Sequence, residues 1–216
     1  MSLIGYWPLN EASGTAYDYS GNEYHGSVNG GVTQGDNGPL AEDSYGFNGS
    51  DGYVSSSESM GISGSDPVSI SAWAKASSST GWQMLAGFHR GQNAGNHFAL
   101  AITGQDEWGV HGWSDGDFDS GVTPDSNWHH LTAVYDGSQL RFYIDGVEAP
   151  NSPFNYTYSI QSTKMFFGVE EERLDHWYSG NLSEVRLYDR PLTESEIQYL
   201  YNVGSRGLQV TGRKSS

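Results

Sequence analysis

The chain has 216 residues, of which 36% are hydrophobic and 13% aromatic, and it carries a formal net charge of −16. This length suits a single all-β domain, and the acidic charge argues against nucleic acid as a partner because phosphates would be repelled. The lack of cysteine excludes disulfides and thiolate metal sites, and no apolar run is long enough for membrane insertion.

Short runs with period-2 alternation follow one another along the chain. Residues 3–9 predict a first strand, and residues 11–31 form a predicted loop region rich in Gly, Ser, Asn and Asp. Residues 68–76 predict a strand with apolar side chains on both faces, as in a strand buried between layers. Further strands are predicted over residues 45–54, 82–89, 97–103, 108–113, 164–169 and 180–188. About a dozen such strands are typical of a sandwich.

The strongest local signal is a β-hairpin over residues 128–146. Two alternating runs flank a short loop, Asp136-Gly137-Ser138, and a second Asp-Gly pair ends the second run. Glycine tolerates the positive φ that tight hairpin loops need. The residues that share one face are Leu131, Ala133 and Tyr135 in the first run and Leu140, Phe142 and Ile144 in the second.

One helix is predicted near the C-terminus. Thr193 and Glu196 fit a capping box, with Thr193 as the N-cap. Apolar residues follow at helical spacing, and Gly204 is a plausible C-terminal stop. We therefore expect one domain over residues 1–205 and a disordered tail over residues 206–216, which are polar and basic.

Several segments together resemble one known family. The hairpin resembles the "W-H-H-v-a-v-y-D-G … l-y-v-D-G" hairpin of laminin G-like domains in the concanavalin A-like lectin/glucanase superfamily. Residues 6–15, 18–26, 47–54, 68–73 and 178–193 resemble further segments of that family, in the family's order. The resemblance implies an all-β fold, a two-sheet antiparallel jelly-roll sandwich, to which the sequence adds one short C-terminal helix. It implies little about function, because such domains serve many roles.

The resemblance also implies a structural calcium ion that ties an N-terminal loop to the last strand. Asp18 would supply a side chain, and Asn22 and His25 would supply backbone carbonyls. The last-strand Asp of the family falls on Ser183, beside Glu184, which removes one expected carboxylate. The alternative is an Asx-turn loop in which Asp18 bonds its own backbone.

A sugar site is a second candidate, since aromatic rings stack on sugars and polar groups bond the hydroxyls. The rings near predicted strand ends are Trp82, Trp108, Trp113 and Trp177, and the polar candidates are His89, Arg90, His111, Asp115 and His176. The alternative for any single Trp is core packing, which we expect for Trp73 and Trp128. The acidic residues 115–121 and 170–173 are expected to be solvated loops, with a weak calcium site as the alternative for the first.

No catalytic constellation is recognisable. Family 16 glycoside hydrolases share the fold and place two glutamates on one strand, as retaining hydrolysis requires. The nearest segment here begins with Tyr143 in place of the first glutamate, and Gly146 breaks the strand before Glu148. His129 and His130 alternate along a strand and so face opposite ways, which prevents joint chelation.

The sequence therefore predicts a non-catalytic extracellular or cell-surface recognition module, either carbohydrate-binding or adhesive, with a glycan or a cell-surface protein as its partner. The alternatives are a structural spacer or protein-interaction domain of a larger surface protein and, third, a polysaccharide-active enzyme. Acidic residues outnumber basic ones by 26 to 10. That excess indicates either adaptation to high salt or an ordinary acidic extracellular surface.

Overall fold

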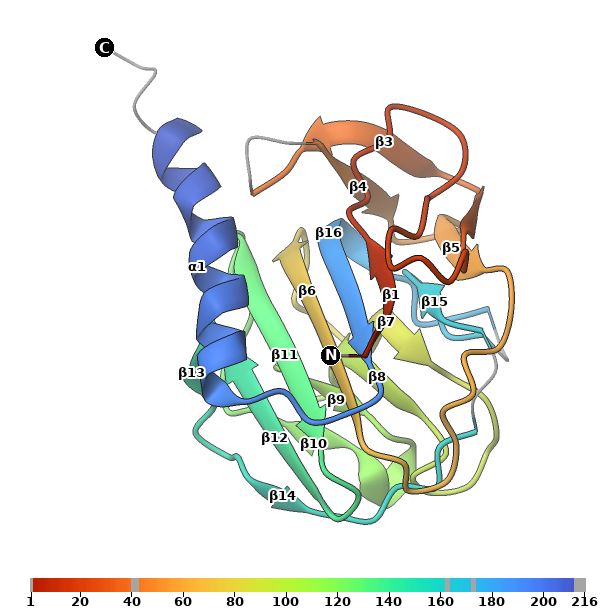
Figure 1. Ribbon diagram of the computed structural model, residues 1–216, viewed down its shortest axis with the longest axis vertical. Helices are drawn as coiled ribbons and strands as arrows, with labels where there is room; N and C mark the ends of the chain where they lie inside the picture. Colours follow the sequence, from red (N-terminus) through yellow and green to blue (C-terminus); the bar gives the residue numbers. More distant parts are fainter. Residues whose placement is uncertain (1, 40–42, 162–163, 172–173, 212–216) are drawn as a thin grey trace.

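The computed structural model describes residues 2–39, 43–161, 164–171 and 174–211, without the side chains of residues 206–211. Within these residues sixteen strands form two antiparallel sheets that face each other, and one α-helix lies outside them (Figure 1). The predicted all-β jelly-roll sandwich with a C-terminal helix is confirmed. No helix in the described part of the chain is both long and apolar enough to cross a membrane.

The first sheet has nine strands. Its order is β13 (Val147–Glu148), β12 (Gln139–Ile144), β11 (His129–Tyr135), β6 (Val68–Ala76), β16 (Ser179–Tyr188), β4 (Asp43–Asn48) and β3 (Val32–Asn37), with β1 (Leu3–Trp7) beside β16 and β14 (Phe154–Asn155) beside β12. Strand β16 is irregular at Ser183 and Glu184, where its neighbour changes from β4 to β1. This one strand thus joins both N-terminal parts of the sheet to its middle.

The second sheet has seven strands. Its order is β10 (Phe118–Asp119), β9 (Trp108–His111), β8 (Phe98–Ile102), β7 (Gln83–Phe88), β15 (Phe166–Phe167), β5 (Tyr53–Ser56) and β2 (Gly26–Asn29). The inner faces of the two sheets bury a shared aromatic core that includes Trp7, Phe98, Trp108 and Phe142, all with no exposed surface. Large rings compensate for the modest hydrophobic fraction, because each buries a large area.

The predicted hairpin is confirmed as β11 and β12. Leu131 pairs with Ile144, Ala133 with Phe142 and Tyr135 with Leu140. The side chains of β11 that face the core are fully buried, as expected, and β6 matches its predicted bounds. The segment 45–54, predicted to carry a strand and a turn at Asp51-Gly52, contains the end of β4, that turn and the start of β5, and the two strands lie in different sheets.

The N-terminal region contains strands that the sequence analysis missed. Strand β2 lies inside the predicted loop region, and β3 follows it. Both are polar edge strands that lack an apolar pattern: β3 alternates half-exposed and exposed residues, and in β2 only Gly26 is buried. Edge strands gain little from burial and are therefore poorly marked by hydrophobic periodicity.

Helix α1 (Glu194–Thr211) packs on the outer face of the nine-stranded sheet, alongside β11 (Figure 1). Its capping box is confirmed, since Thr193 Oγ1 accepts from the N–H of Glu196 and the Glu196 carboxylate accepts from the N–H of Thr193 at 2.9 Å. The predicted stop at Gly204 is wrong, because the helix continues to Thr211. The tail prediction for residues 206–211 is therefore corrected at the backbone, and residues 212–216 lie outside the described residues.

Gly204 has a packing role instead. A Cβ atom at this position would collide with the buried indole of Trp73, which stacks on Tyr201 at 5.9 Å between ring centroids. The absent side chain lets the helix approach the sheet closely. Ile197 and Leu192 complete this contact with Val134, Tyr143 and Tyr188 from the sheet.

Candidate functional site

The outer face of the seven-stranded sheet gathers most of the predicted polar and aromatic site residues. In β8 the core residues Phe98, Leu100 and Ile102 alternate with Ala99 and Ala101, which are fully buried yet lie outside the core cluster. Because these side chains are small, other groups must cover them from outside. The covering groups are histidines, carboxylates and tryptophans from the strand ends and from the loop before β16.

Three buried histidines form the centre of this layer. His97 donates from Nε2–H to the carbonyl of Gly91 at 2.7 Å, and its Nδ1 lies 3.2 Å from Nδ1 of His111. If His97 is neutral, its Nδ1 is the acceptor and His111 must donate. The ring of His89 lies 5.9 Å from that of His97 and 6.5 Å from that of His111, between centroids.

His89 is the most unusual member of the group. It has no exposed surface, and neither ring nitrogen has a hydrogen-bond partner in the described part of the protein. Burial, together with the positive charges of His97, His111 and His176, holds the pKa of His89 well below its usual value of 6.5. The imidazole is therefore neutral and is buried without the bonds that a polar group normally makes.

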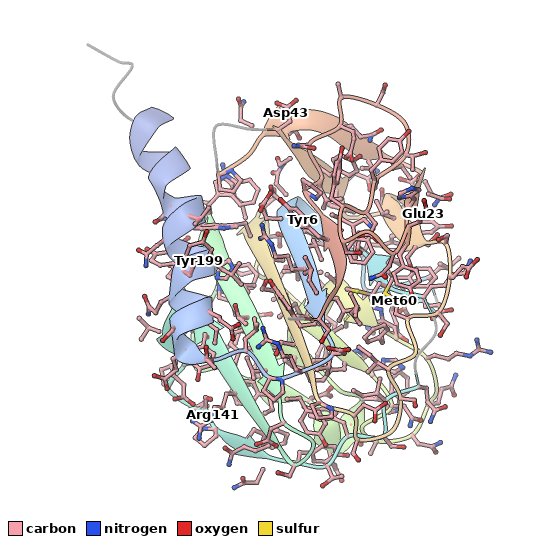
Figure 2. The ribbon with its side chains drawn as sticks, viewed as in Figure 1. Tyr6, Glu23, Asp43, Met60, Arg141 and Tyr199 are labelled. Atoms are coloured by element: carbon pink, nitrogen blue, oxygen red, sulfur yellow. The ribbon has the colours of Figure 1, made fainter. Side chains whose placement is uncertain are left out.

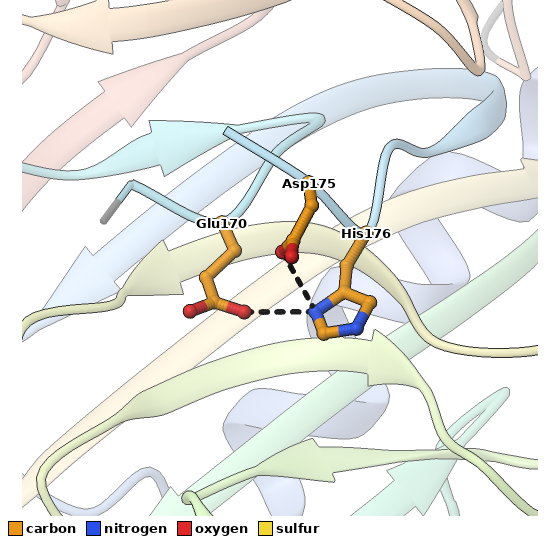
Figure 3. A group of neighbouring side chains, drawn as sticks. All are labelled: Glu170, Asp175 and His176. Atoms are coloured by element: carbon orange, nitrogen blue, oxygen red, sulfur yellow. Dashed lines mark hydrogen bonds and ion pairs between the residues drawn. The ribbon is translucent and has the colours of Figure 1, made fainter. Parts of the chain in front are cut away.

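The segment that leads from β15 to β16 places a carboxylate pair against a fourth histidine (Figure 3). The backbone bridge between Glu170 and Asp175 closes a tight loop, and the carbonyl of His176 accepts from the N–H of Met84 in β7. Nδ1 of His176 lies 2.8 Å from Glu170 Oε2 and 3.1 Å from Asp175 Oδ1. The loop thus presents three ligand-type atoms at one point.

Glu170 is fully buried, which corrects the expectation that residues 170–173 form a solvated loop; Glu172 and Arg173 lie outside the described residues. Burial raises the pKa of the Glu170 carboxyl, but the hydrogen bond from His176 and the positive charges of His111 and His97 outweigh it. The net pKa lies below the usual 4.5, so this buried carboxylate is ionised at neutral pH.

Half-buried tryptophans border the cluster. The Trp82 ring lies 5.0 Å from His111 and 6.3 Å from His176, and the Trp113 ring lies 5.0 Å from His97, between centroids. Trp177 follows His176 and lies 6.1 Å from Tyr53. All three rings keep partial solvent access. Their arrangement offers apolar ring edges beside polar groups, as sugar binding requires.

The other predicted ligand residues divide into exposed and buried ones. Arg90 and Asp115 are exposed, and His176 is half-buried, so the structure leaves them accessible. The expected exposure of Trp108 is wrong, because this ring is fully buried in the core between the sheets. His89 and His111 are also buried, so neither ring is open to solvent. Trp128, expected in the core, is only half-buried.

The acidic segment 115–121 has a defined structure. A short 3-10 turn (Ser114–Gly116) precedes Asp117, whose carboxylate accepts from the N–H groups of Gly112 and Trp113, each at 2.9 Å. Burial raises the pKa of Asp117 to about 6 in spite of these bonds. Asp117 therefore holds the turn that carries Trp113, whereas Asp115 points to solvent, as the solvated-loop interpretation expected.

The residues predicted to bind calcium have other partners. The carboxylate of Asp18 accepts four hydrogen bonds, from the N–H groups of Tyr6, Ser20 and Tyr24 and from the Ser20 hydroxyl, at 2.8–3.0 Å. This pattern includes the Asx turn that the sequence left as the alternative. The carboxylate lone pairs that a calcium ion would need are thus already occupied.

The last-strand side of that predicted site fits calcium no better. Ser183 donates to the carbonyl of Pro8 at 3.2 Å, and Glu184 pairs with Arg186 and accepts from the Tyr6 hydroxyl at 2.9 Å. The guanidinium of Arg186 would repel a cation there. Nδ1 of His25 accepts from the N–H of Asp18, and the Asn22 amide donates to the carbonyl of Ile4. The four bonds to Asp18 and the guanidinium beside Glu184 argue against the ion at these side chains. The calcium site, which also uses the backbone carbonyls of Asn22 and His25, stays a prediction.

The acidic residues of the hairpin are engaged structurally. Asp145 Oδ2 lies 2.7 Å from His129 Nδ1, and Asp145 Oδ1 accepts from the N–H of His130. Glu148 pairs with Arg141 and accepts from Ser152, both at 2.7 Å. These bonds fix the end of the hairpin, which agrees with the structural role expected for His129.

Sequence reasoning missed His97, Glu170 and Asp175. His97 and His111 have a signal in the period-2 pattern, since each falls on the face of its strand opposite the core residues. Glu170 and Asp175 carry no such signal, because they meet only through the fold of their own loop. Burial of a charged loop residue depends on contacts that sequence spacing does not encode.

Solved structures with a similar fold include carbohydrate-related proteins. Domain 4 of AbnA, an extracellular arabinanase of Geobacillus stearothermophilus solved with arabinotriose, aligns with a TM-score of 0.69 and 22% identity, covering 93% of this chain and 98% of that domain. A Trypanosoma rangeli sialidase bound to 2,3-difluorosialic acid aligns with a TM-score of 0.67 and 15% identity, over 93% of this chain but only 32% of its own.

A third similar structure is that of botulinum neurotoxin type C, described by the dependence of its cell entry on two ganglioside molecules. It aligns with a TM-score of 0.69 and 15% identity over 94% of this chain and 51% of its own. These identities establish the fold alone. No curated protein matches the chain. A family model, however, matches residues 48–198, and the chain belongs to the concanavalin A-like lectin/glucanases superfamily in its laminin G-like branch.

Proposed function

We propose that this protein is a non-catalytic carbohydrate-binding module that works outside the cell or at the cell surface. The observation that carries the proposal is the border of half-buried tryptophans, Trp82, Trp113 and Trp177, around a polar cluster on one face. Aromatic rings held rigidly beside hydrogen-bonding groups suit the alternating apolar and hydroxylated faces of a sugar. Arg90, Asp115 and His176 are near enough to solvent to bond its hydroxyls.

The similar structures support a sugar as the ligand. The arabinanase domain was solved with arabinotriose, and the toxin and the sialidase are described with a ganglioside and a sialic acid derivative. The arabinanase domain is almost as long as this chain, whereas the sialidase and toxin chains are far longer. A module that binds sugar without cutting it is consistent with such a domain.

The test is a glycan array followed by calorimetric titration of the strongest hit. We expect Trp82→Ala and Trp113→Ala each to weaken binding at least tenfold, because loss of a stacking ring removes about 1.4 kcal/mol or more. Tyr199→Ala is the matched control: it removes an exposed ring from α1, on the other side of the molecule (Figure 2), and should leave the affinity unchanged.

Three results would overturn the proposal. A silent array would favour the spacer or protein-interaction domain. Equal weakening by Tyr199→Ala would place binding elsewhere. Release of reducing ends from the bound glycan would instead revive the enzyme alternative.

A further inference from the structure

The most unusual arrangement on the seven-stranded sheet is the meeting of Glu170, Asp175 and His176. One ligand-type atom from each lies within 4.8 Å of the other two, and in the described residues no other group of three His, Asp or Glu side chains does so. Both carboxylates meet the same ring nitrogen, Nδ1 of His176, at 2.8 and 3.1 Å (Figure 3). The three ligand-type atoms thus converge on one point.

We propose that Glu170, Asp175 and His176 form a binding site for a divalent transition-metal ion of the zinc type. Zinc binds imidazole nitrogen and carboxylate oxygen at about 2.0–2.2 Å in tetrahedral geometry, which puts neighbouring ligand atoms roughly 3.3 Å apart. The two measured separations are a few tenths of an ångström shorter, as expected where a proton rather than an ion holds the atoms together. Small side-chain shifts would therefore admit the ion.

The proton balance of this step is simple. When His176 is neutral, its proton moves from Nδ1 to Nε2, and the metal takes the Nδ1 lone pair. When His176 is protonated, one proton is released to solvent. Both carboxylates remain ionised, and three protein ligands leave one tetrahedral position open for water or a ligand atom.

Charge favours a cation at this point. The Glu170 carboxyl group is fully buried, and that of Asp175 is half-buried beside it. Two carboxylates meet one imidazole there, so both carboxylates would attract a divalent ion. The formal net charge of −16 also concentrates cations near the surface.

A layer of buried histidines borders the cluster. His89 is fully buried, neutral, and without a hydrogen-bond partner for either nitrogen within the described residues. Its neighbour His111 lies 6.4 Å from His176 between ring centroids. Neutral imidazole is the commonest metal ligand in proteins. Within the cluster, the imidazole of His176 favours zinc-type ions over calcium, which prefers oxygen alone.

The test is titration of chelator-treated protein with zinc chloride by calorimetry at pH 7.5, with calcium chloride as the parallel probe. We expect saturable zinc binding of one ion per chain, and we expect excess calcium not to displace it. His176→Gln and Asp175→Asn should each weaken zinc binding at least tenfold. Asp115→Asn is the matched control, since it removes an exposed carboxylate on the same face but outside the cluster, and should leave zinc binding unchanged.

Thermal unfolding in chelator and in zinc gives the second readout. The wild-type melting temperature should rise with zinc, because the ion binds the folded state, and this rise should vanish in His176→Gln. Non-saturable zinc binding, or equal weakening by Asp115→Asn, would overturn the site in favour of diffuse attraction to an acidic surface. His176 and Asp175 are half-buried, so their variants should fold even if Glu170→Gln does not. None of these readouts requires a glycan.

Discussion

The two outer faces of this sandwich are covered in different ways. On the nine-stranded sheet, α1 seals an apolar cluster of Val134, Tyr143, Tyr188, Leu192 and Ile197. On the seven-stranded sheet, the cover consists of histidines, a buried glutamate and half-buried tryptophans. Apolar packing covers a sheet at a lower cost in folding free energy, because buried polar groups destabilise the folded state unless they are fully hydrogen-bonded. The difference is the one expected if the first face serves stability and the second, as proposed, serves binding.

The largest expected effect tests the stabilising face. Ile197 is fully buried beneath α1, so Ile197→Ala should lower the free energy of unfolding by about 2–5 kcal/mol. Trp82→Ala, on the half-buried border of the other face, should cost clearly less although it removes a larger side chain. Urea denaturation monitored by far-UV circular dichroism measures the free energy of unfolding of both variants. Equal losses would erase the distinction between the two faces.

A second prediction concerns the fit of the helix on its face. Gly→Ala in a helix normally stabilises by about 1 kcal/mol, but a methyl group at Gly204 would meet the indole of Trp73. Gly204→Ala should therefore destabilise the protein by about 1–3 kcal/mol, as expected for overpacking. Tyr199→Ala, on the exposed side of the same helix, should change stability by no more than about 0.5 kcal/mol. A gain in stability for Gly204→Ala would show that α1 is not tightly docked.

A third and smaller effect links both faces to pH. His130 lies beside Trp73 under α1, and His89 lies on the other face. Both side chains are buried and have no hydrogen-bond partner within the described chain. Burial lowers the pKa of both, to about 3 for His130. Below pH 6.5 these two histidines bind protons in the unfolded chain but stay neutral in the folded protein, because burial lowers their pKa there. Each should then lower the free energy of unfolding by about 1.4 kcal/mol per pH unit, a loss that begins near pH 6.5 and, for His130, ends near pH 3.

Urea denaturation at pH 7.5, 6.5 and 5.5 measures this dependence, and His130→Leu and His89→Leu should each flatten it. His129 works in the opposite direction. Its hydrogen bond to Asp145 raises its pKa, so the stability it contributes is complete below pH 6.5 and is lost as the pH rises through the folded pKa. A slope that survives both leucine substitutions would assign the effect to carboxylates instead.

The parts of this molecule that sequence could predict are the locally encoded ones. The hairpin of β11 and β12 is encoded by alternating apolar and polar residues on both sides of an Asp-Gly loop. The capping box of Thr193 and Glu196 spans only four residues. The role of Gly204 was predicted wrongly because it depends on a close approach to Trp73, which is far away in the sequence. Trp108 was misjudged because a strand end can still face the core.

The candidate site was predicted only in part. The half-buried rings and His176 were recognised as ligand candidates, but their neighbours Glu170 and Asp175 were not. Those two residues meet through a loop whose closure depends on β7 and β16 being in place. The pattern of residues within one strand does not encode a contact of this kind.

Strand β16 has a consequence for how the chain is made. It lies between β6 and β4 and also pairs with β1, so β1 and β4 can join the sheet only once it has formed, whereas β6 also pairs with β11. Tyr6 and Glu184, which touch in the finished protein, are 178 residues apart. During synthesis, β1, β3 and β4 emerge first, yet they can join the sheet only after residues 179–188 have left the ribosome. We therefore expect the sheet to close slowly and late, and we expect the apolar residues of β1 to be exposed to aggregation in the meantime.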